Sequence, residues 1–307
     1  MPKIIQSFLW TAVGRLTSVG LISTIYILSG SRVADSQAAE SKQFLWEVET
    51  PQNQVYLLGS IHVLSQNDYP LPPMMETAFE EAEKVVFELD LNELESLETQ
   101  SVMLEKATPP GGQTLRDLVQ PETYQVVENT MNDLGFPIQI FSNFEPWFVS
   151  VSLVALQLQR LGFDPQYGVD RYFFEKAIAD QKQILTLETV EEQLSLFDEL
   201  PPEEQDKLLR QTLEEIDTLE TSFQDMLVAW KTGDTQTLEN LILTGFQDYP
   251  VLEDKIFRDR NQKWMAKIDG FLGDDEDYLI VVGAGHLVGE EGLVEMLRDR
   301  GYSVEQH

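Results

Sequence analysis

The sequence contains no cysteine among its 307 residues. Disulfide bonds, thiolate metal ligands and a thiol nucleophile are therefore excluded. The sequence also lacks a G-x-S-x-G nucleophile elbow, a Walker phosphate-binding loop and a dinucleotide-binding fingerprint. The sequence signatures of serine hydrolases with that elbow, of nucleoside triphosphatases and of dinucleotide-dependent enzymes are thus absent.

Positive charge is scarce. The chain has 21 Lys and Arg against 53 Asp and Glu, a formal net charge of −32. A protein with this charge repels a phosphate backbone at long range, so we expect no nucleic-acid partner. Hydrophobic residues make up 42% of the chain, which is typical of a globular protein that buries a core without covalent cross-links.

The first forty residues have the pattern of a targeting segment. Lys3 and Arg15 precede an apolar stretch at residues 16–28, and Ser36-Gln37-Ala38 fits the small-x-small pattern of a signal peptidase site. We therefore predict that residues 1–38 are a signal peptide or, if uncleaved, an N-terminal membrane anchor. Either form predicts a protein that is exported to the periplasm or cell exterior, or tethered with its domain outside the cytoplasm.

Residues 39–307 are predicted to form a single domain. Its halves, 44–106 and 251–307, flank a largely helical insertion at 113–250. Asp234 or Thr235 is expected to cap a helix that runs through Leu243. Alternating and continuous apolar runs predict strands at 44–49, 54–58, 84–91, 183–187, 278–282 and 302–305, and helical periodicity predicts helices at 74–83, 144–161, 169–180, 202–231, 251–268 and 290–300.

The two halves repeat one unit: an apolar strand, a glycine, two residues, a histidine, a loop, a helix and a second strand. The units begin with Gly59-Ser-Ile-His62 and Gly283-Ala-Gly-His286. This pattern predicts an α/β fold, with α+β as the alternative, in which the two units form a central sheet. Gly59 and Gly283 would let the backbone turn sharply and approach a ligand.

Only three histidines occur, and two of them occupy matched positions after apolar strands. Glu88 follows the next strand along, so a parallel sheet would bring it to the same edge as His62. His62, Glu88 and His286 are therefore candidate ligands for Zn²⁺, Mn²⁺ or Co²⁺, which would acidify a bound water. Alternatively, His62 is a general base whose imidazole Glu88 orients.

Five segments together resemble the TraB/GumN family, relatives of the Tiki proteases. In order they are LLGSIHV at 57–63, VFELD at 86–90, YGVD at 167–170, LETVEEQ at 187–193 and VGAGHL at 282–287. The resemblance spans about residues 44–305. It implies an active centre of the two G-x-x-H histidines and the glutamate after the strand, here His62, His286 and Glu88, metal-dependent proteolysis as in the Tiki branch, and a fold related to erythromycin-esterase-like hydrolases.

Asp170 and Glu188 match further family positions. They are candidates for binding substrate or supporting a metal, and the alternatives are a loop-capping Asp and a solvated Glu. Residues 258–261 resemble an Arg/Asn-bearing helix of the family. Arg260 is the candidate there for binding a substrate carboxylate or oxyanion, with a surface salt bridge as the alternative.

The leading functional hypothesis is an extracytoplasmic hydrolase, specifically a metal-dependent peptidase with Mn, Co or Zn. Its substrate would be a peptide or a small ester or amide. The competing hypothesis is a non-catalytic protein that binds or sequesters a peptide signal in the same cleft.

Overall fold

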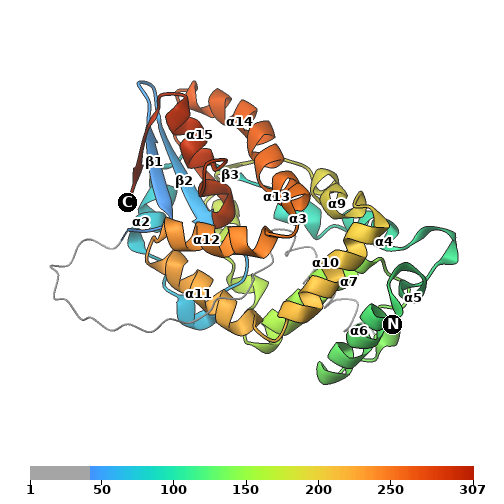
Figure 1. Ribbon diagram of the computed structural model, residues 1–307. Coiled ribbons are helices and arrows are strands. Elements are labelled where there is room, and N and C mark those ends of the chain that lie inside the picture. Colours follow the sequence, from blue (N-terminus) through green and yellow to red (C-terminus); the bar gives the residue numbers. More distant parts are fainter. Residues whose placement is uncertain (1–41) are drawn as a thin grey trace, which may run out of the picture.

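The computed structural model describes residues 42–307 (Figure 1). The predicted signal peptide or anchor at 1–38 lies outside the described residues. Within residues 42–307, no helix combines the length and the apolar character that crossing a bilayer requires.

One six-stranded sheet organises the domain, with strand order β4-β3-β5-β2-β1-β6. The strands β4, β3, β5 and β2 run parallel to one another, and β1 pairs antiparallel with both β2 and β6. The predicted α/β class is confirmed. The strands are β1 (Leu45–Glu49), β2 (Gln54–Ser60), β3 (Lys84–Phe87), β4 (Gln183–Thr186), β5 (Tyr278–Gly283) and β6 (Ser303–Gln306).

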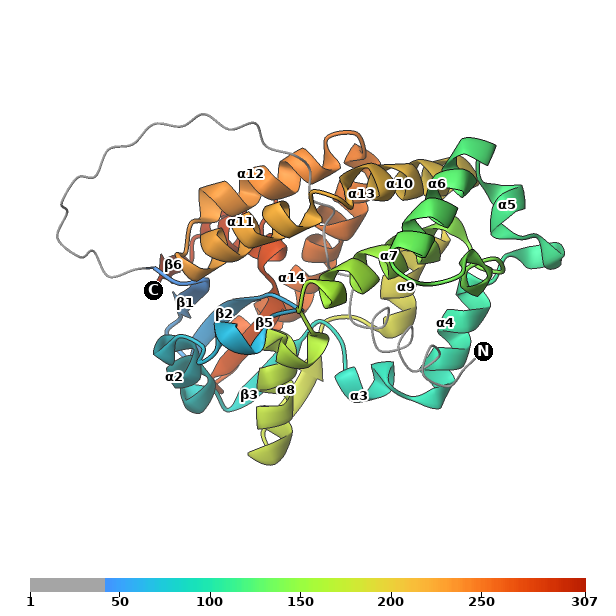
Figure 2. The ribbon, with the colours of Figure 1, turned by 90° about the horizontal axis from the view of Figure 1, so that it is seen from below.

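The central strands are apolar on both sides because helices cover both faces of the sheet. Every residue of β5 is buried, and so are six of the seven residues of β2. In Figure 2, α2 (Pro73–Glu81) and α8 (Val169–Ala179) lie on one side of the sheet. The connections from β4 to β5 and from β5 to β6 run back along the sheet, so right-handed crossovers place α14 (Arg258–Leu272) and α15 (Leu293–Asp299) on the other side, where their apolar residues join the core. The helices α11 (Leu219–Lys231) and α12 (Thr235–Phe246) follow each other, and α12 lies against the turn after β5. Neither strand consequently exposes a face to solvent.

The two repeated units correspond to β2-α2-β3 and to β5-α15-β6, with α15 at Leu293–Asp299. Their first strands are adjacent and parallel, with Ser60 opposite Gly283. Their second strands diverge, because β3 lies beyond β5 while β6 lies beyond β1. The repeat therefore brings the two G-x-x-H segments together at one edge of the sheet.

Strand β3 ends earlier than predicted. It stops at Phe87, and Asp90 caps α3 (Leu91–Leu94) by accepting hydrogen bonds from the amides of Asn92 and Glu93. A capping aspartate starts a helix and thereby ends the extended chain. Glu88 is consequently left at the strand's carboxyl end, as the site hypothesis requires.

Two predicted long helices are each divided. Residues 202–231 form α10 (Pro202–Glu215) and α11, and residues 251–268 fall in α13 (Pro250–Ile256) and α14 (Arg258–Leu272). At the first break the Thr218 hydroxyl donates a hydrogen bond to the Glu215 carbonyl, 3.0 Å away. Hydrogen bonds from a side chain to a nearby backbone carbonyl compete with the backbone hydrogen bonds that would continue the helix.

The remaining helices surround a second buried cluster beside the sheet. They are α4 (Leu97–Ala107), α5 (Leu115–Leu118), α6 (Pro121–Asp133), α7 (Pro146–Arg160) and α9 (Val190–Asp198). Leu91, Val151 and Ile242 contact both this cluster and the core around the sheet. The helical insertion therefore packs directly against the half of the molecule that carries the strands.

Asp234 caps α12, since its carboxylate accepts a hydrogen bond from the Thr237 amide, 3.0 Å away. Replacing Asp234 with alanine should lower the free energy of unfolding by about 1 kcal/mol, because a helix amide loses its acceptor. Thr235→Ala is the matched control and should change stability by less than about 0.5 kcal/mol. Equilibrium urea denaturation of both variants measures the difference, and equal losses would contradict the assignment of the cap.

Candidate active site

The candidate residues meet at the carboxyl edge of the parallel strands. His62 follows β2, Glu88 follows β3, Glu188 follows β4, and His286 lies in the short turn after β5. Loops that leave parallel strands converge at this edge, which is where ligands bind in α/β sheets. The chain thus brings four residues from distant parts of the sequence to one place.

Gly283 marks the point of closest convergence. A side-chain Cβ at this position would lie 3.2 Å from Nε2 of His62, 3.3 Å from Oε1 of Glu88 and 3.6 Å from Cδ2 of His286. These three atoms therefore lie within about 7 Å of one another. A side chain here would crowd the His62 and Glu88 atoms, so glycine lets them approach closely.

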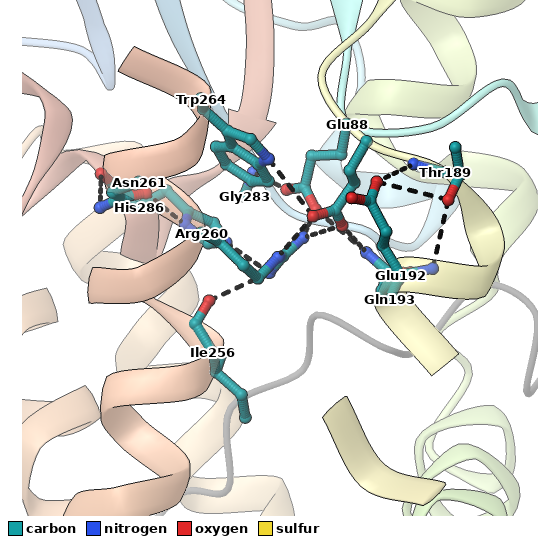
Figure 3. Close-up of polar contacts among 11 residues, drawn as sticks. Glu88, Thr189, Glu192, Gln193, Ile256, Arg260, Asn261, Trp264, Gly283 and His286 are labelled. Carbon is teal, nitrogen blue, oxygen red and sulfur yellow. Dashed lines mark hydrogen bonds and ion pairs between the residues drawn. The ribbon is translucent and has the colours of Figure 1, made fainter. Parts of the chain in front are cut away.

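Arg260, from α14, is the central cation of the site (Figure 3). Its Nη2 donates to Glu88 Oε2 at 2.6 Å and to Glu188 Oε1 at 2.7 Å, and its Nε donates to Glu188 Oε2 at 3.1 Å. Its Nη1 donates to the carbonyl of Ile256 at 3.2 Å and to Nε2 of His286 at 2.8 Å. All five N–H groups of the guanidinium are thereby used.

This geometry corrects both predictions made for Arg260. The side chain is only 2% exposed, so it is not a surface salt bridge. It has no free N–H with which to bind a substrate carboxylate or oxyanion in this arrangement. Its neighbour Arg258 is 38% exposed and pairs with Asp254 on the surface. Arg260 therefore acts inside the protein, as the counter-ion of two buried carboxylates.

His286 is fixed in one protonation state. Because a guanidinium only donates, Nε2 of His286 must accept from Arg260, and Nδ1 carries the hydrogen, which it donates to Oδ1 of Asn261 at 2.7 Å. The amide of Asn261 donates in turn to the carbonyls of His286 and Glu291. Burial and the adjacent Arg260 lower the pKa of His286 to about 3. His286 is therefore neutral, with both ring nitrogens occupied.

The two buried glutamates share Arg260 but differ in their other partners. Burial by itself raises the pKa of Glu88, yet Arg260 and the hydrogen bond from the Gly283 amide, 2.7 Å from Oε1, outweigh it and lower that pKa to about 2. Burial leaves the pKa of Glu188 raised despite Arg260. Glu188 also accepts from Nε1 of Trp264 and from Nε2 of Gln193. The alternative of a solvated Glu188 is thus wrong, because the side chain is buried.

His62 has the opposite character from His286. Its Nδ1 lies 3.2 Å from Oδ2 of Asp170, on α8. Among the described residues, neither Nε2 of His62 nor Oδ1 of Asp170 has a hydrogen-bond partner. Burial lowers the pKa of His62, but Asp170, followed by Glu88, outweighs burial and leaves this pKa above its ordinary value. Asp170, and not Glu88, is therefore the carboxylate that orients this imidazole.

The predicted metal ligands do not form a metal site as they are arranged. Across residues 42–307, no three His, Asp or Glu side chains are grouped so that they would hold one ion. The reason is visible in the contacts: Arg260 occupies Nε2 of His286 and Oε2 of Glu88. Of the predicted ligand atoms, only Nε2 of His62 and Oε1 of Glu88 keep a lone pair near the Cβ position of Gly283. His62, Glu88 and His286 thus do not fit the three-ligand set expected for a catalytic metal.

Two residues of the network were not predicted as site residues, namely Gln193 and Trp264. Trp264 lies one helical turn after Arg260 on α14, so the i, i+4 spacing places both on one face. Gln193 lies one turn after Thr189, the residue that caps α9 next to Glu188. The spacing of one helical turn could have indicated both residues in the sequence. It identifies site residues, however, only when the face of each helix that is buried is known.

A cleft of about 730 Å³ reaches Arg260 from the surface. Its walls come from α9 and from α13 and α14, and they include Glu192, Lys255 and Lys263. The cleft does not reach His62. It exposes one edge of the network without giving access to the unpartnered imidazole nitrogen.

Arg260→Met should destabilise the fold by about 3–5 kcal/mol at pH 7, because two buried carboxylates lose their counter-ion. Glu88 contributes stability above its ordinary pKa of 4.5 and loses it as the pH falls toward about 2. The difference in free energy of unfolding between the parent and Arg260→Met should therefore become smaller below about pH 5, because protonated carboxyl groups need no counter-ion. Urea denaturation between pH 3 and pH 8 measures it. Arg258→Met, two residues away on the same helix, should change stability by less than about 1 kcal/mol, and equal effects would refute the buried network.

Comparison with known proteins agrees with this arrangement of motifs. The model of the TraB/PrgY/gumN family matches residues 44–306. An uncharacterized protein of Escherichia coli strain K12, YbaP, is 27% identical over 268 residues, which cover 85% of this chain and 96% of that protein. No solved structure matches.

More distant relatives are named as metalloproteases. Metalloprotease TIKI1 of Danio rerio is 24% identical and covers 90% of this chain and 65% of its own. Metalloprotease TIKI2 of Xenopus tropicalis is 25% identical and covers 85% of this chain and 59% of its own. This chain thus spans about three fifths of the Tiki proteins. The family match covers almost all of the described residues, and the chain belongs to the TraB/PrgY/gumN family.

Proposed function

We propose that this protein is a hydrolase that cleaves an amide or ester bond, in a peptide or a small molecule, with water that His62 activates. The observation that carries this proposal is the state of the His62 imidazole. One ring nitrogen faces a carboxylate, while the other is buried beside Glu88 and Gly283 and has no partner within residues 42–307. An oriented imidazole with an open nitrogen is the arrangement of a general base.

Asp170 determines which nitrogen of His62 acts. Its carboxylate accepts the hydrogen of Nδ1, which leaves the lone pair on Nε2 free to take a proton. A water molecule that transfers one proton to Nε2 attacks the carbonyl carbon through its oxygen. The carbon–nitrogen or carbon–oxygen bond to the leaving group then breaks, and the same proton passes from His62 to the departing amine or alkoxide. The raised pKa of His62 strengthens it as a base near neutral pH.

Arg260 and His286 are positioning residues in this mechanism. His286 accepts from Arg260, and Arg260 holds Glu88 and Glu188 at the strand ends. Glu88 in turn fixes the Gly283 amide and lies beside Nε2 of His62. The network thus keeps a negative charge next to the imidazolium that forms when His62 takes a proton. Such preorganised charge stabilises the transition state without rearrangement.

Metal-dependent proteolysis is the second candidate, and the names of the Tiki relatives favour it. A divalent ion would supply Lewis-acid chemistry and an acidified water. Of the predicted ligands, however, His286 and one oxygen of Glu88 are held by Arg260. The general-base mechanism uses residues in the positions they already occupy, so we place it first.

Asp170→Asn and His62→Ala should each lower kcat/KM by on the order of 10²-fold or more, because the base is misoriented or absent. In the parent, kcat/KM should fall as the pH drops through a pKa above the ordinary histidine value of 6.5, since protonated His62 cannot accept a proton. Asp170→Asn should move that midpoint to lower pH. Glu88 and the cationic Arg260 also face this imidazole and remain unchanged in the variant. Peptide-library cleavage followed by pH–rate profiles measures both effects.

Metal dependence is tested in the same assay. Dialysis against a chelator should leave the parent rate within about twofold if the His62 mechanism holds, and so should adding Mn²⁺, Co²⁺ or Zn²⁺. Loss of activity on chelation and its return with one ion would establish the metal-dependent peptidase instead. A parent protein that binds peptides but cleaves none, with or without metals, would favour the sequestering alternative.

We also propose that the domain acts outside the cytoplasm, either exported or membrane-anchored. The apolar stretch at 16–28 and the small-x-small site at 36–38 support this. An alkaline phosphatase reporter fused after His307, which is active only outside the cytoplasm, should be active. The same fusion without residues 1–38 should be inactive. A full-length fusion that stays inactive while its protein accumulates would refute the location.

A further inference from the structure

A buried serine hydroxyl lies beside the proposed base and takes no part in the network around Arg260. Ser60 is the last residue of β2, two positions before His62, and is 1% exposed. Among the described residues, its Oγ has no hydrogen-bond partner. A buried hydroxyl without a partner costs about 1–3 kcal/mol, so alanine would be the more stable choice here if nothing bound to that oxygen.

An unpartnered hydroxyl is not by itself a site, because Ser152 on α7 is also 1% exposed and unpartnered. The position of Ser60 sets it apart. Ser60 pairs with Gly283 across the parallel strands β2 and β5, so its side chain points to the same sheet face as the missing side chain of Gly283. That direction leads to Nε2 of His62, 3.2 Å from the Cβ position of Gly283.

The spacing suits one bridging molecule. Adjacent strands are about 4.8 Å apart, which places the Ser60 Cβ within roughly 8 Å of Nε2 of His62. The Oγ and Nε2 atoms do not bond directly, since neither has a partner in the part of the chain that the structure describes. A water that bridges two polar atoms joins groups roughly 5–6 Å apart. Buried waters bond to polar groups that otherwise lack a partner, and both of these atoms are of that kind.

We propose that Ser60 Oγ and His62 Nε2 together hold the attacking water, an inference that rests on the proposed hydrolase function. One hydrogen of the water bonds to Nε2, and the other bonds to Oγ. With both hydrogens engaged, an oxygen lone pair points at the substrate carbonyl carbon. Ser60 forms no covalent bond and loses no proton. His62 takes the proton of the water as the new carbon–oxygen bond forms.

Ser60→Ala should lower kcat by about 10- to 100-fold with KM and the pH–rate midpoint unchanged, because the base remains but its water is misplaced. Ser60→Thr keeps the hydroxyl and should restore most of kcat. Ser152→Ala removes an equally buried hydroxyl on α7, which carries none of the site residues, and should leave kcat at the parent value. A crystal structure of the parent should show a water within about 3.2 Å of both Oγ and Nε2.

Three results would overturn the assignment of Ser60. The first is an active parent whose Ser60→Ala variant cleaves at the same rate. The second is a covalent acyl group on Ser60 detected by mass spectrometry, which would make it the nucleophile. The third is a crystal structure without a shared water. A parent with no hydrolytic activity would instead refute the proposed function, and the crystal structure would still decide whether Ser60 and His62 share a water.

Discussion

Arg260 connects the parts of the structure that the candidate site depends on. Its guanidinium joins the ends of β3 and β4 through Glu88 and Glu188, and it joins the turn after β5 through His286. Two carboxylates buried side by side would otherwise repel each other and lose hydration without compensation. A planar cation with five donors satisfies both carboxylates and one imidazole at once, which lysine does not do. The ends of β3, β4 and β5 are therefore held together by the charge of Arg260 as well as by the order of the strands in the sheet.

The two G-x-x-H segments have acquired different roles in this arrangement. They begin on adjacent parallel strands, yet His286 lies against Arg260 and Asn261, whereas His62 lies against Asp170. A donor on one side and an acceptor on the other hold His286 neutral. A carboxylate beside Nδ1 keeps His62 basic, with its second nitrogen open. Matching sequence motifs thus produce one histidine with both ring nitrogens occupied and one with an open nitrogen, and the difference comes from neighbours supplied by α8 and α14.

Much of the fold was predictable because its strands are short apolar runs with clear turns. The hairpin of β1 and β2 and the strand β4 follow from local patterns, and so does a cap at Asp234 or Thr235, of which the structure has Asp234. The breaks within 202–231 and 251–268 were missed because periodicity continues across them. At Thr218 a single side-chain hydrogen bond interrupts the helix, and residue 257 adopts φ −109° and ψ −70° between α13 and α14. The spacing of apolar residues does not predict helix breaks of this kind.

The sequence by itself determined which residues gather at the sheet edge, because each follows a strand whose apolar run is readable and parallel strands end together. It also determined the family, through five motifs in order. Only the tertiary structure decided what each residue does there. Whether a histidine binds a metal, accepts from an arginine or faces a carboxylate depends on side chains that approach from distant helices. Arg260 is close to Glu88 in space but 172 residues away in the chain, and no local pattern records that contact.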